Sequence, residues 1–112
     1  MTETTTETPV LDLLKTMTTD SIEASTLDEE TLMLVRIAAL VAVDAPPVSY
    51  LLNIGAAGDV GIDADQVQGV LAAVAPIVGT ARIASAAGNM VQALGFAEEL
   101  AELDVPDDGN SQ

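Results

Sequence analysis

The chain has 112 residues, a formal net charge of -15, and neither histidine nor cysteine. Those two residue types supply most imidazole bases, thiol nucleophiles and transition-metal ligands, so the composition excludes disulfides and thiol chemistry, and we expect no metal and no cofactor. With 3 basic residues against 18 acidic ones, no nucleic-acid partner is expected, because affinity for phosphate backbones comes from lysine and arginine.

The charge is concentrated in two flanks. Residues 1–31 and 98–112 hold 14 acidic residues and one cation, Lys15, whereas residues 32–97 carry a net charge of only -2. Large apolar surfaces usually mark interfaces, so this nearly uncharged middle is expected to lie under its own flanks or between subunits. We favour a homo-oligomer.

The N-terminal flank divides into a tail and an arm. Residues 1–8 contain only threonine and glutamate after Met1 and are predicted to be a disordered acidic tail. Residues 9–25 are predicted to form an amphipathic N-terminal arm that begins at Pro9 and could cover a neighbouring subunit. Its apolar residues recur at helical spacing, at Val10, Leu11, Leu13, Leu14 and Met17.

The next two helices are separated by a proline turn. Thr26 and Glu29 match a capping box, which predicts a helix over residues 27–43. The Asp-Ala-Pro-Pro segment that follows ends this helix, because proline lacks an amide donor and disfavours helical backbone in the preceding residue. Pro47 suits the first turn of the next helix, which is expected to end among the glycines after residue 57.

The C-terminal half is predicted to contain helices over 64–75 and 81–94, and a short amphipathic turn over 96–103. Asp63 is expected to cap the first helix, and Pro76 to kink or end it. Gly95 is expected to close the second as a left-handed C-cap residue, and 98–112 is predicted to be an acidic turn and tail. No segment shows the two-residue period of a strand, so the fold class is predicted to be all-α.

The apolar stretches are too short or too interrupted to span a membrane. Residues 32–43 include Arg36, and residues 67–87 include Pro76, whereas a span needs about 18 to 20 apolar residues. The first residues are acidic and polar, unlike a signal peptide. We therefore expect no membrane span and a cytoplasmic location.

Five polar residues of the middle are candidates for a pocket. Arg36 and Arg82 each lie in an otherwise apolar helix, where they either pair with acids of the chain or hold a small carboxylate ligand through two hydrogen bonds. Ser49, Tyr50 and Asn53 are neighbours on the helix after Pro47, and they either line the same pocket or act as a turn cap and an interface hydroxyl. No catalytic residue can be assigned among them.

The order of segments over residues 27–97 resembles the carboxymuconolactone decarboxylase-like family, which includes the alkylhydroperoxidase-like proteins. The resemblance rests on the pattern Gly-Ile-Asp-x-x-x-Val, on the alanine-rich segment VLAAVAPIVGTAR and on the closing segment AAGNMVQALG. It implies an all-helical domain over residues 26–97 that forms trimers or hexamers by packing helices between subunits.

The redox branch of that family carries a Cys-x-x-Cys-x-x-x-His motif, whose positions fall here on Pro46, Ser49 and Asn53. Thiol peroxidase and disulfide reductase chemistry are therefore excluded. The resemblance then implies a noncatalytic oligomeric binding or structural module with a degenerate active site. The alternative is a divergent lyase or decarboxylase-type enzyme for a small carboxylate or lactone. A third hypothesis is that segments 10–17 and 96–103 dock onto a partner protein.

Overall fold

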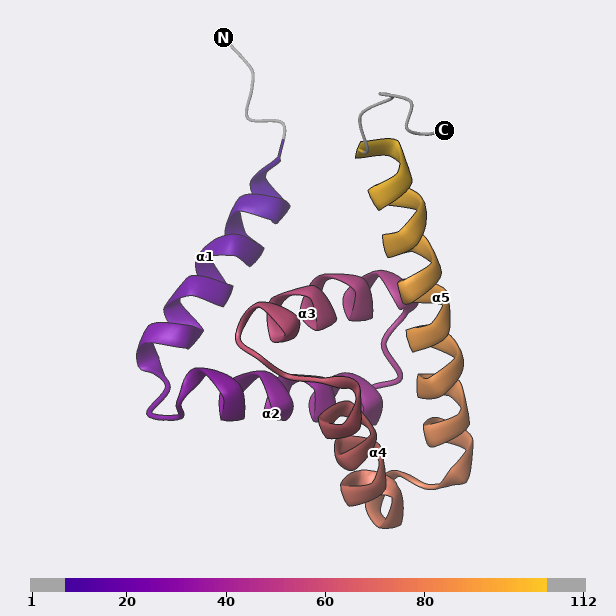
Figure 1. Cartoon of the computed structure of the whole chain (residues 1–112). Helices are drawn as coiled ribbons and strands as arrows, with labels where there is room; N and C mark the ends of the chain where they lie inside the picture. Colours follow the sequence, from indigo (N-terminus) through magenta and orange to yellow (C-terminus); the bar gives the residue numbers. More distant parts are fainter. Residues whose placement is uncertain (1–7, 105–112) are drawn as a thin grey trace, which may run out of the picture.

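A computed structural model describes residues 8–104, and every regular element in that range is an α-helix (Figure 1). The helices are α1 (Pro9–Ala24), α2 (Glu29–Ala42), α3 (Pro47–Asp59), α4 (Ala64–Val78) and α5 (Thr80–Asp104). The all-α prediction is therefore confirmed. Residues 1–7 and 105–112, which belong to the predicted acidic tails, lie outside the described residues.

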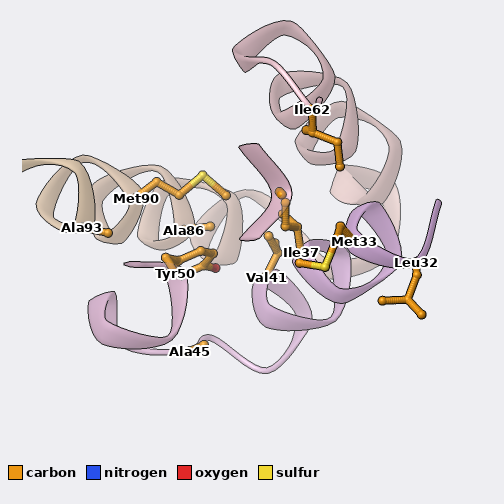
Figure 2. Close-up of a cluster of buried hydrophobic side chains, with 11 residues drawn as sticks. Leu32, Met33, Ile37, Val41, Ala45, Tyr50, Ile62, Ala86, Met90 and Ala93 are labelled. Atoms are coloured by element: carbon orange, nitrogen blue, oxygen red, sulfur yellow. The ribbon is translucent and has the colours of Figure 1, made fainter. Parts of the chain in front are cut away.

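The bundle is built around α2 and the α3–α5 pair. Helix α2 packs against α3, α4 and α5, and α3 packs along α5. Figure 2 shows the buried cluster, in which Tyr50 of α3 lies against α5 near Ala86 with Val41 of α2 beside it. The core is small. Its members are Leu32, Met33, Ile37, Val41, Ala45, Tyr50, Ala57, Ile62, Ala86, Met90 and Ala93.

Two predicted helix starts are confirmed. Helix α3 begins at Pro47, directly after the extended residue Pro46. Helix α4 has Asp63 as its N-cap, and the carboxylate accepts the Gln66 amide at 2.9 Å while the Gln66 side chain accepts the Asp63 amide at 3.0 Å. This reciprocal capping box satisfies two amide groups that the helix leaves without partners.

The start of α2 differs from the prediction. The N-cap is Asp28, whose carboxylate accepts the Thr31 amide at 2.8 Å, and not Thr26. The hydrogen bonds with Thr31 hold the pKa of the Asp28 carboxyl below its usual value of 3.8. Aspartate and threonine both serve as N-caps, but the charge of Asp28 also complements the positive end of the helix dipole.

The end of α5 also differs from the prediction. Gly95 is not a C-cap, because α5 continues through it to Asp104 and absorbs the short turn expected over 96–103. The residues after Gly95 are rich in alanine, glutamate and leucine, whose helix propensities outweigh the cost of about 1 kcal/mol for one glycine. The break before α5 is at Gly79, where φ is 90°. Pro76 falls in the last turn of α4, which ends two residues later.

None of the helices over residues 8–104 is both long enough and apolar enough to cross a membrane.

Candidate functional site

Arg36 connects α2 to α1. Its guanidinium donates to the Ser21 hydroxyl at 3.0 Å and to the Thr18 carbonyl at 3.4 Å. Both acceptors are neutral groups near the C-terminal end of α1. Arg36 therefore links α2 to α1 through hydrogen bonds. This contact differs from both alternatives considered from the sequence, an ion pair with an acid of the chain and a site for a carboxylate ligand.

Arg82 belongs to a group of polar side chains on α5 that bind the end of α2 and the turn between α2 and α3, residues 43–46. We define the polar clamp as Arg82, Ser85 and Asn89, which share one side of α5 by helical spacing. Arg82 donates to the Ala42 carbonyl at 3.0 Å, and this cation lies at the negative end of the α2 dipole.

The other two clamp residues hold the turn itself. The Ser85 hydroxyl donates to the Asp44 carboxylate at 2.6 Å, and the Asn89 amide donates to the Ala45 carbonyl at 3.0 Å. Asp44 has φ 57°, in the left-handed region that aspartate tolerates better than most residues. The chain has no histidine to activate Ser85 as a nucleophile, so this contact is best described as an anchor for the turn.

Ser49 and Asn53 are part of the first turns of α3. The Ser49 amide donates to the Pro46 carbonyl at 3.0 Å, and the Asn53 side chain donates to the Ser49 carbonyl at 2.9 Å. The side-chain amide of Asn53 thus donates a hydrogen bond within its own helix. The contacts of both residues are therefore local to α3.

Tyr50 is fully buried, and its hydroxyl has no hydrogen-bond partner within the described structure. Burial raises the pKa of the phenol above its usual value of 10.0, and the negative charge of Asp44 raises it further. An orphan hydroxyl in an apolar cluster destabilises the fold by about 1–3 kcal/mol.

An apolar groove lies between α3, α4 and α5. Its larger part is an open cleft of about 400 Å³, and a smaller part of about 180 Å³ shares Ile54 and Leu94 with it. We define the groove by all the residues that line the two parts. They are Leu51, Ile54, Gly55, Ala57, Gly58, Ile62, Asp63, Ala64, Val67, Gln68, Leu71, Ala87, Met90, Val91, Ala93, Leu94 and Ala97.

The predicted pocket residues and this groove do not coincide. None of the five candidates, Arg36, Ser49, Tyr50, Asn53 and Arg82, is among the residues that line the groove. Tyr50 lies near Asp44 of the turn between α2 and α3, and Arg82 of α5 donates to Ala42 just before that turn. Arg36, in contrast, lies beside α1. No group of three or more acidic residues placed to hold a metal ion occurs within residues 8–104.

Sequence reasoning missed Ser85, Asn89 and the groove. The two side chains bind residues 41 and 44 positions earlier in the chain, so no local pattern reports the contact. Their i, i+4 spacing in an apolar helix is the one signal that could have suggested a shared polar contact.

Comparisons with protein-family models, curated proteins and solved structures find no match to this chain.

Proposed function

We propose that this protein is a noncatalytic helical module that assembles into a homo-oligomer, a trimer or a hexamer, and that it acts by binding or by scaffolding. The exclusion of thiol and imidazole chemistry supports the noncatalytic part of the proposal. The resemblance to carboxymuconolactone decarboxylase-like proteins supports the assembly.

One observation carries the proposal, which is the amount of apolar surface that is exposed on the described part of the chain. Among residues 8–102, sixteen large apolar side chains are at least 42% exposed, against eleven buried apolar residues of which four are alanines. Monomeric proteins rarely expose apolar surface on this scale, whereas subunits of an oligomer cover it on association.

The overall dimensions support the same conclusion. The Cα radius of gyration is 16.8 Å, while a compact chain of this length is expected near 13 Å. Helix α1 contributes to the difference, because it has no buried residue and lies apart from α4 and α5 (Figure 1).

Within residues 8–104, no contact favours the alternative of a lyase for a small carboxylate. Both arginines donate to groups of the chain itself, and the groove has no cation among its lining residues. A carboxylate would enter that groove without a partner, which is unfavourable.

A matched pair of variants tests the proposal by sedimentation velocity. Leu94→Glu places a charge on an exposed apolar position of α5, and Gln92→Glu places the same charge two residues away on an exposed polar position. We expect the wild type and Gln92→Glu to sediment as the same oligomer and Leu94→Glu to shift toward the monomer. Indistinguishable sedimentation of all three as monomers would contradict the proposal.

A further inference from the structure

Arg36 of α2 sets the register in which α2 meets α1. Its guanidinium donates to the Thr18 carbonyl and to the Ser21 hydroxyl, which lie three residues apart on one side of α1. The linker between the two helices, residues 25–28, has the length that joins antiparallel helix pairs. In such a pair, each turn back along α1 from Thr18 faces one turn forward along α2 from Arg36.

Along both helices, this register matches apolar side chains that are exposed. Leu14 and Leu11 lie one and two turns before the Arg36 contact on the same side of α1, and they are 49% and 55% exposed. Ala39 and Val43 lie one and two turns after Arg36 on α2. Ala39 is exposed, and Val43 is 69% exposed. In an antiparallel pair, Leu14 is therefore opposite Ala39, and Leu11 is opposite Val43.

This side of α2 is free because the core uses a different one. Ile37 and Val41 have no exposed surface and belong to the buried cluster. Helical spacing places both of them at least about 100° around the helix axis from Arg36, Ala39 and Val43. A helix can therefore cover the side that carries Ala39 and Val43 without displacing the core.

Next to the linker, α1 and α2 are already in partial contact. Ile22 of α1 and Leu32 of α2 line one small cleft of about 160 Å³, and Ile22 is still 48% exposed, so the packing at this end is incomplete. The hydrogen bonds of the linker are local, since the Leu27 amide donates to the Ser25 hydroxyl at 3.1 Å and Asp28 caps α2. Neither bond joins α1 to α2, so both are compatible with a change in the angle between these helices.

We propose that α1 is a strap that closes on α2 of its own chain and forms an antiparallel helix pair, with Leu14 against Ala39 and Leu11 against Val43. Figure 1 shows the strap open, with the two helices diverging from the linker. Closure continues the contact made by Arg36, because narrowing the angle between the helices brings the neighbouring turns together. It buries apolar side chains of both helices and so sets how much apolar surface the chain presents. The inference does not depend on the proposed assembly, because closure occurs within one chain.

Disulfides within one chain test the closure, because the chain contains no cysteine of its own. The double variants Leu14→Cys/Ala39→Cys and Leu11→Cys/Val43→Cys join positions that the closed pair brings within disulfide reach, which requires Cα atoms no more than about 7 Å apart. All four positions are exposed, so the substitutions leave the core intact. Each variant is equilibrated at low micromolar concentration in a glutathione buffer, so that the disulfide yield reports proximity at equilibrium.

Two matched controls move the α1 thiol to the polar side of the helix. Thr16→Cys/Ala39→Cys and Asp12→Cys/Val43→Cys place it one or two residues away, at exposed positions that the closed pair turns away from α2. Both control positions are slightly nearer to the linker than the residues they replace. An unpaired and freely moving α1 would therefore crosslink them at least as well.

The expected result is a crosslinked monomer in several-fold higher yield from both test variants than from their controls. Yields equal to those of the controls would overturn the inference. Crosslinks that form only between two chains would also overturn it, because α1 would then cover the α2 of a second copy.

Sedimentation of the wild type separates this inference from the proposed function. A wild-type monomer, together with the specific crosslinks within one chain, would refute the assembly and support the strap. A wild-type oligomer without those crosslinks would support the assembly and refute the strap.

Discussion

At the scale of single residues, Tyr50 is the largest fully buried side chain of the described residues, and its hydroxyl is a buried polar atom without a hydrogen-bond partner among them. Its ring fills the space between α3 and α5 (Figure 2). Its hydroxyl neither donates nor accepts a hydrogen bond within the described structure. The ring stabilises the fold, whereas the oxygen opposes it.

We therefore expect Tyr50→Phe to raise the free energy of unfolding by about 1 kcal/mol, because the ring remains and the orphan hydroxyl is removed. Tyr50→Ala is the contrast and should lower it by about 3–5 kcal/mol through loss of the ring and formation of a cavity. Urea denaturation of the three proteins measures both changes. A less stable Tyr50→Phe variant would show that the hydroxyl has a partner.

The phenol also predicts a pH dependence. Its pKa is raised above 10.0 in the folded state, so the unfolded chain loses the proton first as the pH rises. The stability is therefore fully present below pH 10 and falls as the pH rises through the folded pKa. Tyr50→Phe should show a smaller loss of stability than the wild type in urea titrations on either side of pH 10.

Two contacts of the polar clamp, one to a buried residue and one to an exposed residue, are expected to contribute differently to the free energy of unfolding. Asn89 satisfies the carbonyl of Ala45, a residue that is only 5% exposed, whereas Arg82 satisfies the carbonyl of the exposed residue Ala42. Asn89→Ala should cost about 1–3 kcal/mol, and Arg82→Ala less than about 1 kcal/mol because water replaces the donor. Thermal unfolding of both variants compares the two losses, and equal losses would contradict this account.

At the scale of elements, two glycines of similar sequence context have opposite roles. Gly95 lies inside α5, has no positive φ, and has no atom within 4 Å of the site where a Cβ would stand. Gly79 joins α4 to α5 with φ 90°, a conformation that side chains with a Cβ rarely adopt.

Gly95→Ala is therefore expected to stabilise the protein by about 0.5–1 kcal/mol, and Gly79→Ala to destabilise it by about 1 kcal/mol or more. Differential scanning calorimetry should show melting temperatures that move in opposite directions. A destabilised Gly95→Ala protein would support the C-cap that the sequence suggested.

The elements that sequence analysis predicted correctly are those whose chemistry is local. Pro47 and Asp63 mark their helix starts because ring geometry and side-chain capping act within one turn. Thr26 was a wrong choice because Asp28 competes for the same role two residues later. Gly95 was wrong because the whole segment after it favours a helix.

The site was less predictable than the helices, because it depends on how the helices pack. Arg36 and Arg82 stand out in the sequence by their charge, but their acceptors are two backbone carbonyls and one hydroxyl, groups that are common in every protein. The groove arises where small residues such as Gly58, Ala64 and Ala87 leave space between helices, and their spacing alone does not locate that space.

At the scale of the whole molecule, the acidic flanks and the apolar surface act in opposite directions on assembly. Each chain has a net charge of -15, so copies repel one another, while the exposed apolar side chains attract. Most of this charge belongs to the flanks, whereas residues 32–97 carry a net charge of only -2.

We therefore expect salt to strengthen the assembly, since screening reduces the repulsion and leaves hydrophobic contacts intact. Sedimentation at about 20 mM and about 500 mM NaCl, where the Debye length falls from about 20 Å to about 4 Å, measures the shift. An oligomer that dissociates at high salt would mean that ion pairs, and not apolar contacts, hold the copies together.

The most direct test of the assembly is small-angle X-ray scattering of the wild-type chain over a range of concentrations. The account predicts a particle mass of three or six times the 11.4 kDa chain and a radius of gyration above the 16.8 Å of the single chain. A mass of 11.4 kDa at every concentration would contradict it.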